Sequence, residues 1–299
     1  MAQMIELSAD DYRLVLEPER GGSIARFAWC GRDVFRPSRA GSMFDTACFP
    51  LVPFSNRIAH GRFKANGHEI ELAPNMPGSD HPHPLHGFGW LAVWDVIEHV
   101  PDRAVLRHHY PAGEWPWAYI AEQIFDLSAD GLRYELSLHN VSETPMPAGL
   151  GFHPYFPRNA ETRYLGLHCG EWQTAEDGLP IALDERSVAR DWWEAQPVSK
   201  RTVDTVYTGR HGAISILWPD RDLALAIQPS PDLPFTVVFT PPEADFFCVE
   251  PVSHSTDAIN RPDGNNGLAM LTAGASLSVS MQLAADHLPL TPQIPEQPQ

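Results

Sequence analysis

The sequence predicts an all-β protein built as a large antiparallel β-sandwich, and three observations support this fold class. The segments Leu132 to Leu138 and Leu277 to Leu283 alternate apolar and polar residues, which is typical of strands with one buried face. The chain has 29 prolines among 299 residues, about double ordinary usage, and prolines disfavour long helices. Apolar runs recur at short spacing with turn signals between them, as in sandwiches.

Short strands are therefore expected along most of the chain. Their expected positions are Met4 to Trp29 with a turn at Gly21-Gly22, Asp45 to Pro53, Leu91 to Val100, Arg103 to Tyr110, Tyr119 to Leu127, Leu132 to Leu138, Ala213 to Trp218, Leu223 to Gln228, Phe235 to Thr240 and Leu277 to Leu283. No regular alternation of strands and helices is present, which argues against a doubly wound or barrel architecture.

Three other segments complete the prediction. Asn66-Gly67 predicts a hairpin from His60 to Leu72, because Asn-Gly is the strongest short hairpin signal. Pro74 to Gly89 is expected to be a long irregular loop with a function. A helix is expected only at Asp184 to Glu194.

A sandwich of this length can form one domain, so we expect a single domain over residues 1–288. The tail of residues 289–299 is rich in proline and glutamine, and we expect it to be flexible.

Composition excludes several classes of function. The formal net charge is −17, and no basic patch is present to bind a nucleic-acid backbone. No secretory signal or apolar run of membrane-spanning length is visible, so we expect a cytoplasmic protein with neither a nucleic-acid nor a membrane partner. The four cysteines lack metal spacing and are expected to be free thiols buried in or near strands: Cys30, Cys48, Cys169 and Cys248.

Three stretches of similar design are the candidates for a functional site. His153 lies between glycines and Pro154, Glu250 ends an apolar run before Pro251, and His86 lies among glycines and aromatic residues. Glycine allows close backbone approach, and proline fixes the exit of the chain. We expect the three stretches to meet, so that His86, His153 and Glu250 form one site.

This combination suits acid/base chemistry. A carboxylate after Phe246-Phe-Cys-Val is costly to bury unless it is paired or solvated. Burial raises a carboxyl pKa, and a nearby histidine allows proton sharing near neutral pH. Two structural alternatives stay open: an ion pair of Glu250 with Arg57, and a histidine at position 153 that is held only by hydrogen bonds.

The motifs resemble those of the aldose 1-epimerase, or galactose mutarotase, family over roughly Met4 to Leu283. Five pieces occur in that family's order: Asn56-Arg57-Ile58 before a Gly-x-Phe hairpin, Leu85-His86-Gly87 before Trp94, Gly151-Phe-His153-Pro-Tyr-Phe156, Val203-Asp204-x-x-Tyr207, and Glu250-Pro251 with Asn260 downstream.

The resemblance implies a galactose mutarotase-like β-supersandwich that binds a monosaccharide and needs no cofactor or metal. It implies that Glu250 is the general base, that His153 is the general acid and that His86 stabilises the ring-oxygen side. Sugar hydroxyls would be bound by Asn56, Arg57 and Asp204. Trp117 is expected to stack on the sugar, with Trp115, Phe88 and Trp90 as further candidates.

Three alternative functions stay open. A metal-dependent hydrolase could use His81, His83 and His86 together with His153 and Glu250. A sugar-binding protein without activity could have the same fold. A hexose-6-phosphate 1-epimerase would need additional Arg or Lys residues for the phosphate. The identity of the sugar and the oligomeric state are left open by the sequence.

Overall fold

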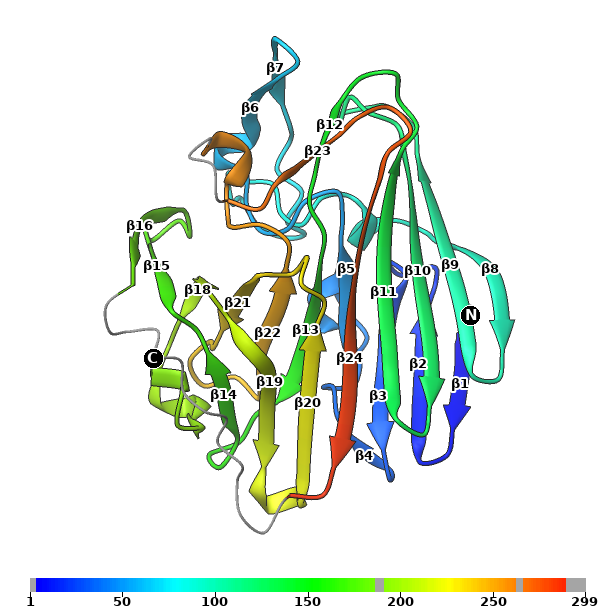
Figure 1. Ribbon diagram of the computed structural model, residues 1–299, viewed down its shortest axis with the longest axis vertical. Helices are drawn as coiled ribbons and strands as arrows, with labels where there is room; N and C mark the ends of the chain where they lie inside the picture. Colours follow the sequence, from blue (N-terminus) through cyan, green and yellow to red (C-terminus); the bar gives the residue numbers. More distant parts are fainter. Residues whose placement is uncertain (1–3, 186–190, 262–265, 289–299) are drawn as a thin grey trace.

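Two antiparallel sheets lie face to face in the computed structural model, which describes residues 4–185, 191–261 and 266–288 (Figure 1). The eleven-stranded sheet has the order β1 (Ile5–Ala9), β2 (Tyr12–Glu17), β3 (Ser23–Trp29), β5 (Cys48–Leu51), β13 (Gly151–Pro157), β22 (Phe246–Val252), β21 (Phe235–Phe239), β18 (Asp204–Thr208), β15 (Gly170–Thr174) and β16 (Pro180–Asp184), with β4 (Arg32–Asp33) paired to β3.

The nine-stranded sheet covers one face of the larger sheet. Its order is β17 (Gln196–Pro197), β14 (Arg163–Leu167), β19 (His211–Trp218), β20 (Leu223–Pro229), β24 (Ser276–Asp286), β11 (Gly131–Asn140), β10 (Tyr119–Ser128), β9 (Arg103–Tyr110) and β8 (Asp95–Val100). Two small pairs are added, β12 (Met146–Ala148) with β23 (Ala269–Leu271) and β6 (Arg62–Ala65) with β7 (His68–Glu71). The β6–β7 hairpin projects from the body (Figure 1).

The main hydrophobic core lies between the two sheets. It contains side chains of alternate residues from both, such as Leu14 and Phe27 from one sheet and Phe125 and Tyr134 from the other, all less than 3% exposed. Alternation along a strand sends neighbouring side chains to opposite faces. The residues between these core positions on the larger sheet therefore face away from the nine-stranded sheet.

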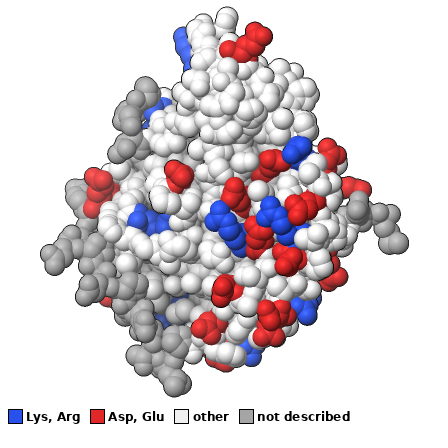
Figure 2. Space-filling model, turned by 45° about the vertical axis from the view of Figure 1, so that its right-hand side comes forward, with Lys and Arg blue, Asp and Glu red and all other residues white. Residues whose placement is uncertain are grey.

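The outer face of β8 to β10 is polar and mixed in charge. Cross-strand ion pairs join Arg103 to Asp126 and Arg107 to Glu122. Figure 2 shows acidic and basic side chains intermixed on this side of the molecule rather than gathered in a basic patch. This pattern of a buried face and a solvated face explains the period of two in the sequence.

The all-β, antiparallel prediction is confirmed, and the expected strands are present with small shifts of their ends. The hairpin is also confirmed, since Phe63 of β6 pairs with Ile70 of β7. Helical structure in the described ranges is confined to short 3₁₀ segments. None of the described helical segments is long and apolar enough to cross a membrane.

The sequence prediction was wrong in the segment from 163 to 208. Five strands there were not expected: β14, β15, β16, β17 and β18. The helix expected from Asp184 to Glu194 is wrong at its start, because Asp184 is the last residue of β16. At its end, Asp191 and Trp192 are 3₁₀-helical, and Trp193 and Glu194 form a turn. Residues 186–190 lie outside the described residues, as do 289–299, where the tail was expected, so the single-domain boundary at 288 stays a prediction.

The cysteine prediction needs a partial correction. All four are free thiols, but only Cys48 and Cys248 are buried, whereas Cys30 and Cys169 are exposed. Cys30 adopts a positive φ of 48° directly after β3, so it belongs to a surface turn rather than to the interior of a strand.

Candidate active site

The pairing of β13 with β22 positions the predicted acid and base. The register that aligns Gly151 with Val252 and Tyr155 with Cys248 sets His153 opposite Glu250. His153 Nε2 lies 3.2 Å from Glu250 Oε1. Both residues are buried, with exposed fractions of 6% and 2%. The two stretches singled out in the sequence therefore meet side chain to side chain.

Both polar groups retain an atom without a partner. His153 Nδ1 and Glu250 Oε2 are buried and form no hydrogen bond with any described residue. The imidazole is instead held by ring contacts, since it stacks on Phe49 of β5 with centroids 4.4 Å apart and on Tyr155 at 4.8 Å. Buried polar atoms in native proteins normally have partners, so these two atoms are candidates for hydrogen bonds with a ligand.

His86 approaches the pair from the loop before β8. The Asn56 backbone N–H donates to His86 Nδ1 at 3.1 Å, and the His86 N–H donates to the Asn56 carbonyl at 3.0 Å. Because Nδ1 accepts, a neutral His86 carries its proton on Nε2. The His86 ring is perpendicular to that of His153, with centroids 5.1 Å apart.

Gly87, directly after His86, allows the loop to pass close to the backbone of Val52. Gly87 has φ +71°, and a Cβ atom there would lie 2.2 Å from the Val52 carbonyl oxygen. Only glycine permits this approach of the loop to β5. The Leu85-His86-Gly87 motif therefore fixes the position of the imidazole through the backbone.

Arg57 and Asp204 form a second polar pair in the site. Arg57 Nη2 donates to Asp204 Oδ2 at 3.2 Å, and Arg57 Nη1 donates to Asn56 Oδ1 at 3.1 Å. The alternative in which Arg57 forms an ion pair with Glu250 is therefore wrong, because the carboxylate that Arg57 contacts is that of Asp204. Asp204 is on β18, in the segment where the sequence predicted no strand.

Burial controls the protonation of the three central groups. It raises the pKa of Glu250 well above its usual value, and the nearby Asp204 raises it further, whereas Arg57 lowers it. Burial lowers the pKa of His153 to about 3. Burial also lowers the pKa of His86 well below its usual value, with smaller contributions from His153 and Arg57. These shifts favour the neutral form of both imidazoles near pH 7.

These residues line a cavity of about 200 Å³. This volume is below the range of pockets for drug-sized ligands, so it suits a smaller molecule. Six of the predicted site residues are in its wall, namely Asn56, Arg57, His86, His153, Asp204 and Glu250. The wall also contains apolar side chains that the sequence did not single out for this role: Phe44, Met76, Leu85, Val237, Phe239 and Phe246, with Tyr155 beside them.

The prediction of which aromatic residues would stack on a ligand needs the main correction, because these residues do not line the cavity. Trp117 is 3% exposed in the main core, where it contacts Trp115 and its indole N–H donates to Thr144 Oγ1 at 3.1 Å. Phe88 packs against Tyr110, away from the cavity wall. Trp90 is fully buried behind His86. The phenylalanine and tyrosine side chains that do line the cavity are those of Phe44, Tyr155, Phe239 and Phe246.

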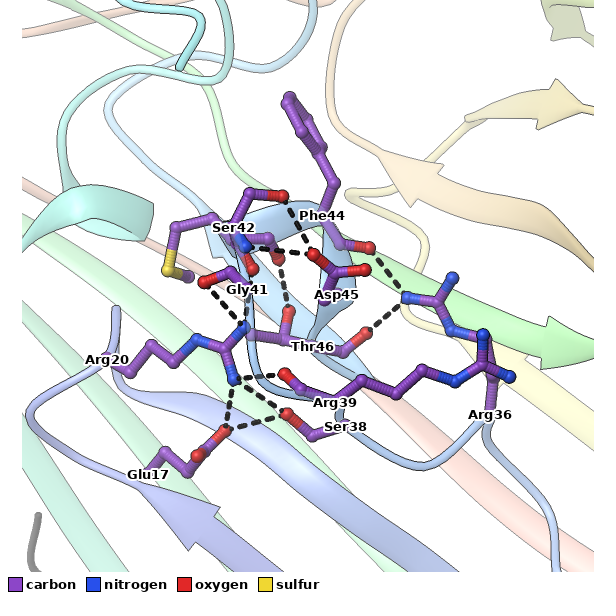
Figure 3. A network of polar contacts seen from close by, with 11 residues as sticks. Glu17, Arg20, Arg36, Ser38, Arg39, Gly41, Ser42, Phe44, Asp45 and Thr46 are labelled. Carbon is purple, nitrogen blue, oxygen red and sulfur yellow. Dashed lines mark hydrogen bonds and ion pairs between the residues drawn. The ribbon is translucent and has the colours of Figure 1, made fainter. Parts of the chain in front are cut away.

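Arg36 holds the segment that contains Phe44, and Figure 3 shows its polar contacts with that segment. Arg36 donates to the carbonyls of Phe44 and Thr46 at 2.6 and 3.0 Å. Its guanidinium also lies over the rings of Tyr155 and Phe246, 4.3 and 4.6 Å from their centroids. One buried cation thus fixes three of the apolar residues of the cavity.

The histidines of the Pro74 to Gly89 loop do not join His153 and Glu250 as one set of metal ligands. His83 contacts Asp177 and the ring of His81, whereas His86 is next to His153. Among the described residues, the group whose potential ligand atoms lie within 4.8 Å of one another is His153, Cys248 and Glu250. Burial raises the pKa of the Cys248 thiol well above its usual value, which favours the protonated thiol over the thiolate that binds metals.

Comparison with known proteins assigns the chain to a family. The family model described as aldose 1-epimerase matches residues 3–284. The uncharacterized protein YphB of Escherichia coli K12 is 33% identical over 279 residues, which cover 90% of this chain and 94% of YphB.

Solved structures agree with this assignment. A crystal structure from Escherichia coli K12, provisionally named an aldose 1-epimerase, has a TM-score of 0.88 and 32% identity over 96% of this chain and 99% of that one. A galactose mutarotase-like protein from Clostridium acetobutylicum has a TM-score of 0.84 with 17% identity over 95% of each chain, which supports the fold alone.

Proposed function

Because the chain belongs to the aldose 1-epimerase family, we propose that it is an isomerase that interconverts the α and β anomers of a free aldose by acid/base catalysis. The observation that supports this best is the buried His153–Glu250 pair, which has vacant hydrogen-bonding atoms at a small cavity. A pair of this kind can remove one proton and supply another in the same event.

The proposed reaction conserves all atoms. Glu250 takes the proton of the anomeric hydroxyl while His153 gives a proton to the ring oxygen. The bond between C1 and the ring oxygen breaks, and its electron pair goes to that oxygen as the C1 carbonyl forms. Rotation about the C1–C2 bond and the reversed proton transfers then give the other anomer.

The proton count of the pair suits this scheme. Burial favours a neutral imidazole and a protonated carboxyl, since it lowers the His153 pKa and raises that of Glu250. Transfer of that one proton across the 3.2 Å contact gives the reactive imidazolium and carboxylate without any exchange with solvent. In the resting pair the proton is on Glu250, so the reactive form requires this uphill transfer and is reached only while the pair holds one proton.

The other residues of the site would orient the sugar. His86 presents an Nε2–H beside His153, and this donor can stabilise charge on the ring oxygen. Arg57, Asn56 and Asp204 offer donors and acceptors for hydroxyls. Phe44, Phe239 and Phe246 supply the apolar surface that the C–H groups of a sugar contact.

A free sugar fits the cavity better than a sugar phosphate. Arg57 is the one Lys or Arg side chain among the described residues of the cavity wall. Its charge is already compensated by Asp204. A phosphate would need a cation that is not already paired, because it carries about two negative charges near pH 7.

The direct test is mutarotation of fresh single-anomer sugars followed by polarimetry or NMR. We expect catalysed equilibration of at least one free aldose, above the rate without enzyme, and a loss of most of this acceleration in Glu250→Gln. Binding of the sugars without any acceleration would instead support a sugar-binding protein. Acceleration restricted to hexose 6-phosphates would overturn the preference for a free sugar.

A further inference from the structure

A second cavity, of about 500 Å³, lies beside the active site on the same face of the eleven-stranded sheet. Its wall includes Trp172 of β15, Leu183 of β16, Thr208 of β18 and Phe235 of β21, with Ser255 and Arg261 after β22. None of its described lining residues belongs to the wall of the active-site cavity.

Strand geometry relates the two cavities. Along β18, Asp204 lines the active site and Thr208 lines the second cavity. Residues four apart point to the same face and lie about 13 Å apart along a strand. Along β21, Val237 and Phe235 divide between the two cavities in the same way. The second cavity is therefore a neighbour of the first, displaced along the same two strands.

Cross-strand pairing places an indole in line with the base. Val206 pairs with Val237, and Val237 pairs with Glu250. The register of β15 on β18, in which Glu171 pairs with Tyr207, sets Trp172 opposite Val206. Trp172 thus lies in the same cross-strand row as Glu250, on the edge of the second cavity that is nearest to the active site.

Two buried donors in this wall have no acceptor. Trp172 Nε1 and Arg261 Nη1 are both buried, and neither forms a hydrogen bond with a described residue. The Arg261 guanidinium lies over the Trp172 ring, 3.9 Å from its centroid, and this contact orients the two groups together. A buried donor without a partner costs free energy, so a ligand with acceptor oxygens at this place would be stabilised.

The remaining chemistry of the wall indicates the class of ligand. Glu185 adds an acceptor, Ser255 and Thr208 add hydroxyls, and Leu183 and Phe235 add apolar surface. A simple anion would be repelled by Glu185 and by the net charge of −17. A saccharide has hydroxyls that both donate and accept, together with apolar C–H faces, and so it matches all of these groups.

We propose that this cavity is a second carbohydrate-binding site. Its saccharide comes from one of two sources: the distal part of a reducing oligosaccharide whose terminal aldose occupies the active site, or a separate sugar molecule. The first source rests on the proposed function, and the second does not. In both cases Trp172 Nε1 and Arg261 Nη1 donate to sugar oxygens.

The test uses Trp172→Phe, which removes one donor but keeps an aromatic ring, and Arg261→Gln, which removes the charge. Arg221→Gln is a matched control, because Arg221 lies over the Trp218 ring at 5.5 Å and lines neither cavity. Binding of glucose and maltotriose is measured by calorimetry, and their mutarotation by NMR. Unchanged melting temperatures confirm that the variants are folded.

If the cavity holds the distal part of the substrate, both variants lower kcat/KM for maltotriose by roughly tenfold, the equivalent of one charged hydrogen bond, and leave that for glucose unchanged. If it holds a separate sugar, wild type binds glucose at two sites, each variant loses one of them, and mutarotation is unaffected.

The same titrations in the Glu250→Gln background separate this proposal from the proposed function. Saccharide binding that is weakened by Trp172→Phe and Arg261→Gln, with no mutarotation by the wild type or any variant, would support the second site and reject the isomerase. The second site would be overturned if wild type, Trp172→Phe and Arg261→Gln bound and turned over both sugars equally. It would also be overturned if Arg221→Gln lost as much binding or kcat/KM as the two variants, or if neither variant changed the binding of any saccharide.

Discussion

The two faces of β13 and β22 show how one pair of strands serves two purposes. On the face toward the nine-stranded sheet, Phe152 and Phe247 are fully buried in the main core. His153, one residue from Phe152, and Glu250, three residues from Phe247, point to the opposite face, where they are also buried but keep polar atoms without a partner. The difference indicates that burial on the first face serves stability, whereas burial on the second tunes protonation.

A comparison of two buried histidines makes the same point. Burial lowers the pKa of His254 to about 4 and that of His153 to about 3. His254 uses both ring nitrogens, since the Ser55 N–H donates to Nε2 at 3.0 Å and Nδ1 donates to the Ser255 carbonyl at 2.8 Å. His153 leaves Nδ1 vacant. His168 is equally buried and also leaves Nδ1 without a partner, so what sets His153 apart is its contact with Glu250 in the wall of a cavity.

The largest effect is expected from removal of the base. Glu250→Gln keeps the shape of the side chain but cannot accept the anomeric proton, so kcat should fall by roughly 10²–10⁴. Sugar affinity should change far less, because the amide still forms hydrogen bonds. Kinetics of mutarotation and calorimetric sugar binding, measured on the same preparation, check both expectations.

A substitution on the opposite face of the same strand should produce the reverse pattern. Phe152→Ala removes a fully buried ring that lies 4.3 Å from that of Tyr134. The free energy of unfolding should fall by about 3–5 kcal/mol, while kcat per folded molecule stays within a few-fold of wild type. Denaturant unfolding and kinetics at low temperature test this. A loss of kcat as large as that of Glu250→Gln would show that the two faces are not separable.

A smaller effect is expected where a turn covers Arg57. Gly178, between β15 and β16, has φ +79°, and a Cβ atom there would lie 2.5 Å from Arg57 Cζ. Gly178→Ala should displace Arg57, the proposed sugar-binding group, and raise KM by roughly tenfold, or about 1.4 kcal/mol, with little change in kcat.

Gly67→Ala is the matched control for this prediction. Gly67 has φ +80°, and a Cβ atom there would meet nothing within 4 Å, so this variant has the same backbone strain without the contact. Equal values of KM in the two variants would refute the role given to the turn at Gly178.

The smallest effect concerns the pH dependence near neutrality. The pair reacts when it holds one proton, so kcat/KM should be constant between the lowered pKa of His153 and the raised pKa of Glu250. It should fall as pH rises through the elevated pKa of Glu250, because no proton then remains for the ring oxygen, and as pH falls toward about 3, because a second proton occupies the base. A profile that instead rises above pH 4 as a carboxyl of ordinary pKa ionises, and stays high in alkali, would contradict proton sharing.

The sequence predicted the polar part of the site better than its apolar part. His86, His153 and Glu250 lie in motifs marked by Gly87, Pro154 and Pro251, whose backbone constraints are local. Trp117 was misassigned because a tryptophan near a site and a tryptophan in the core have the same local pattern. Its position is decided by the packing of the two sheets, which is a tertiary property.

The missed strands have a similar cause. The alternation is weak in β15, with the sequence Gly-Glu-Trp-Gln-Thr, and in β16. β16 is the edge strand of the sheet, and β15 is its neighbour. Edge strands are specified by the pairing of their neighbours more than by their own apolar residues. The wall formed by Phe44 was equally hidden, because its position depends on Arg36, a contact eight residues away in a segment without regular structure.

The central claim is that Glu250 and His153 act as one unit, and a double-mutant cycle on kcat tests it most directly. Glu250→Gln, His153→Asn and the double variant are compared with wild type on one confirmed aldose. We predict that each single variant loses roughly 10²–10⁴ in kcat and that the double variant loses far less than the product of the two. Losses that multiply would contradict the shared-proton unit, and near wild-type turnover in Glu250→Gln would remove Glu250 from the mechanism.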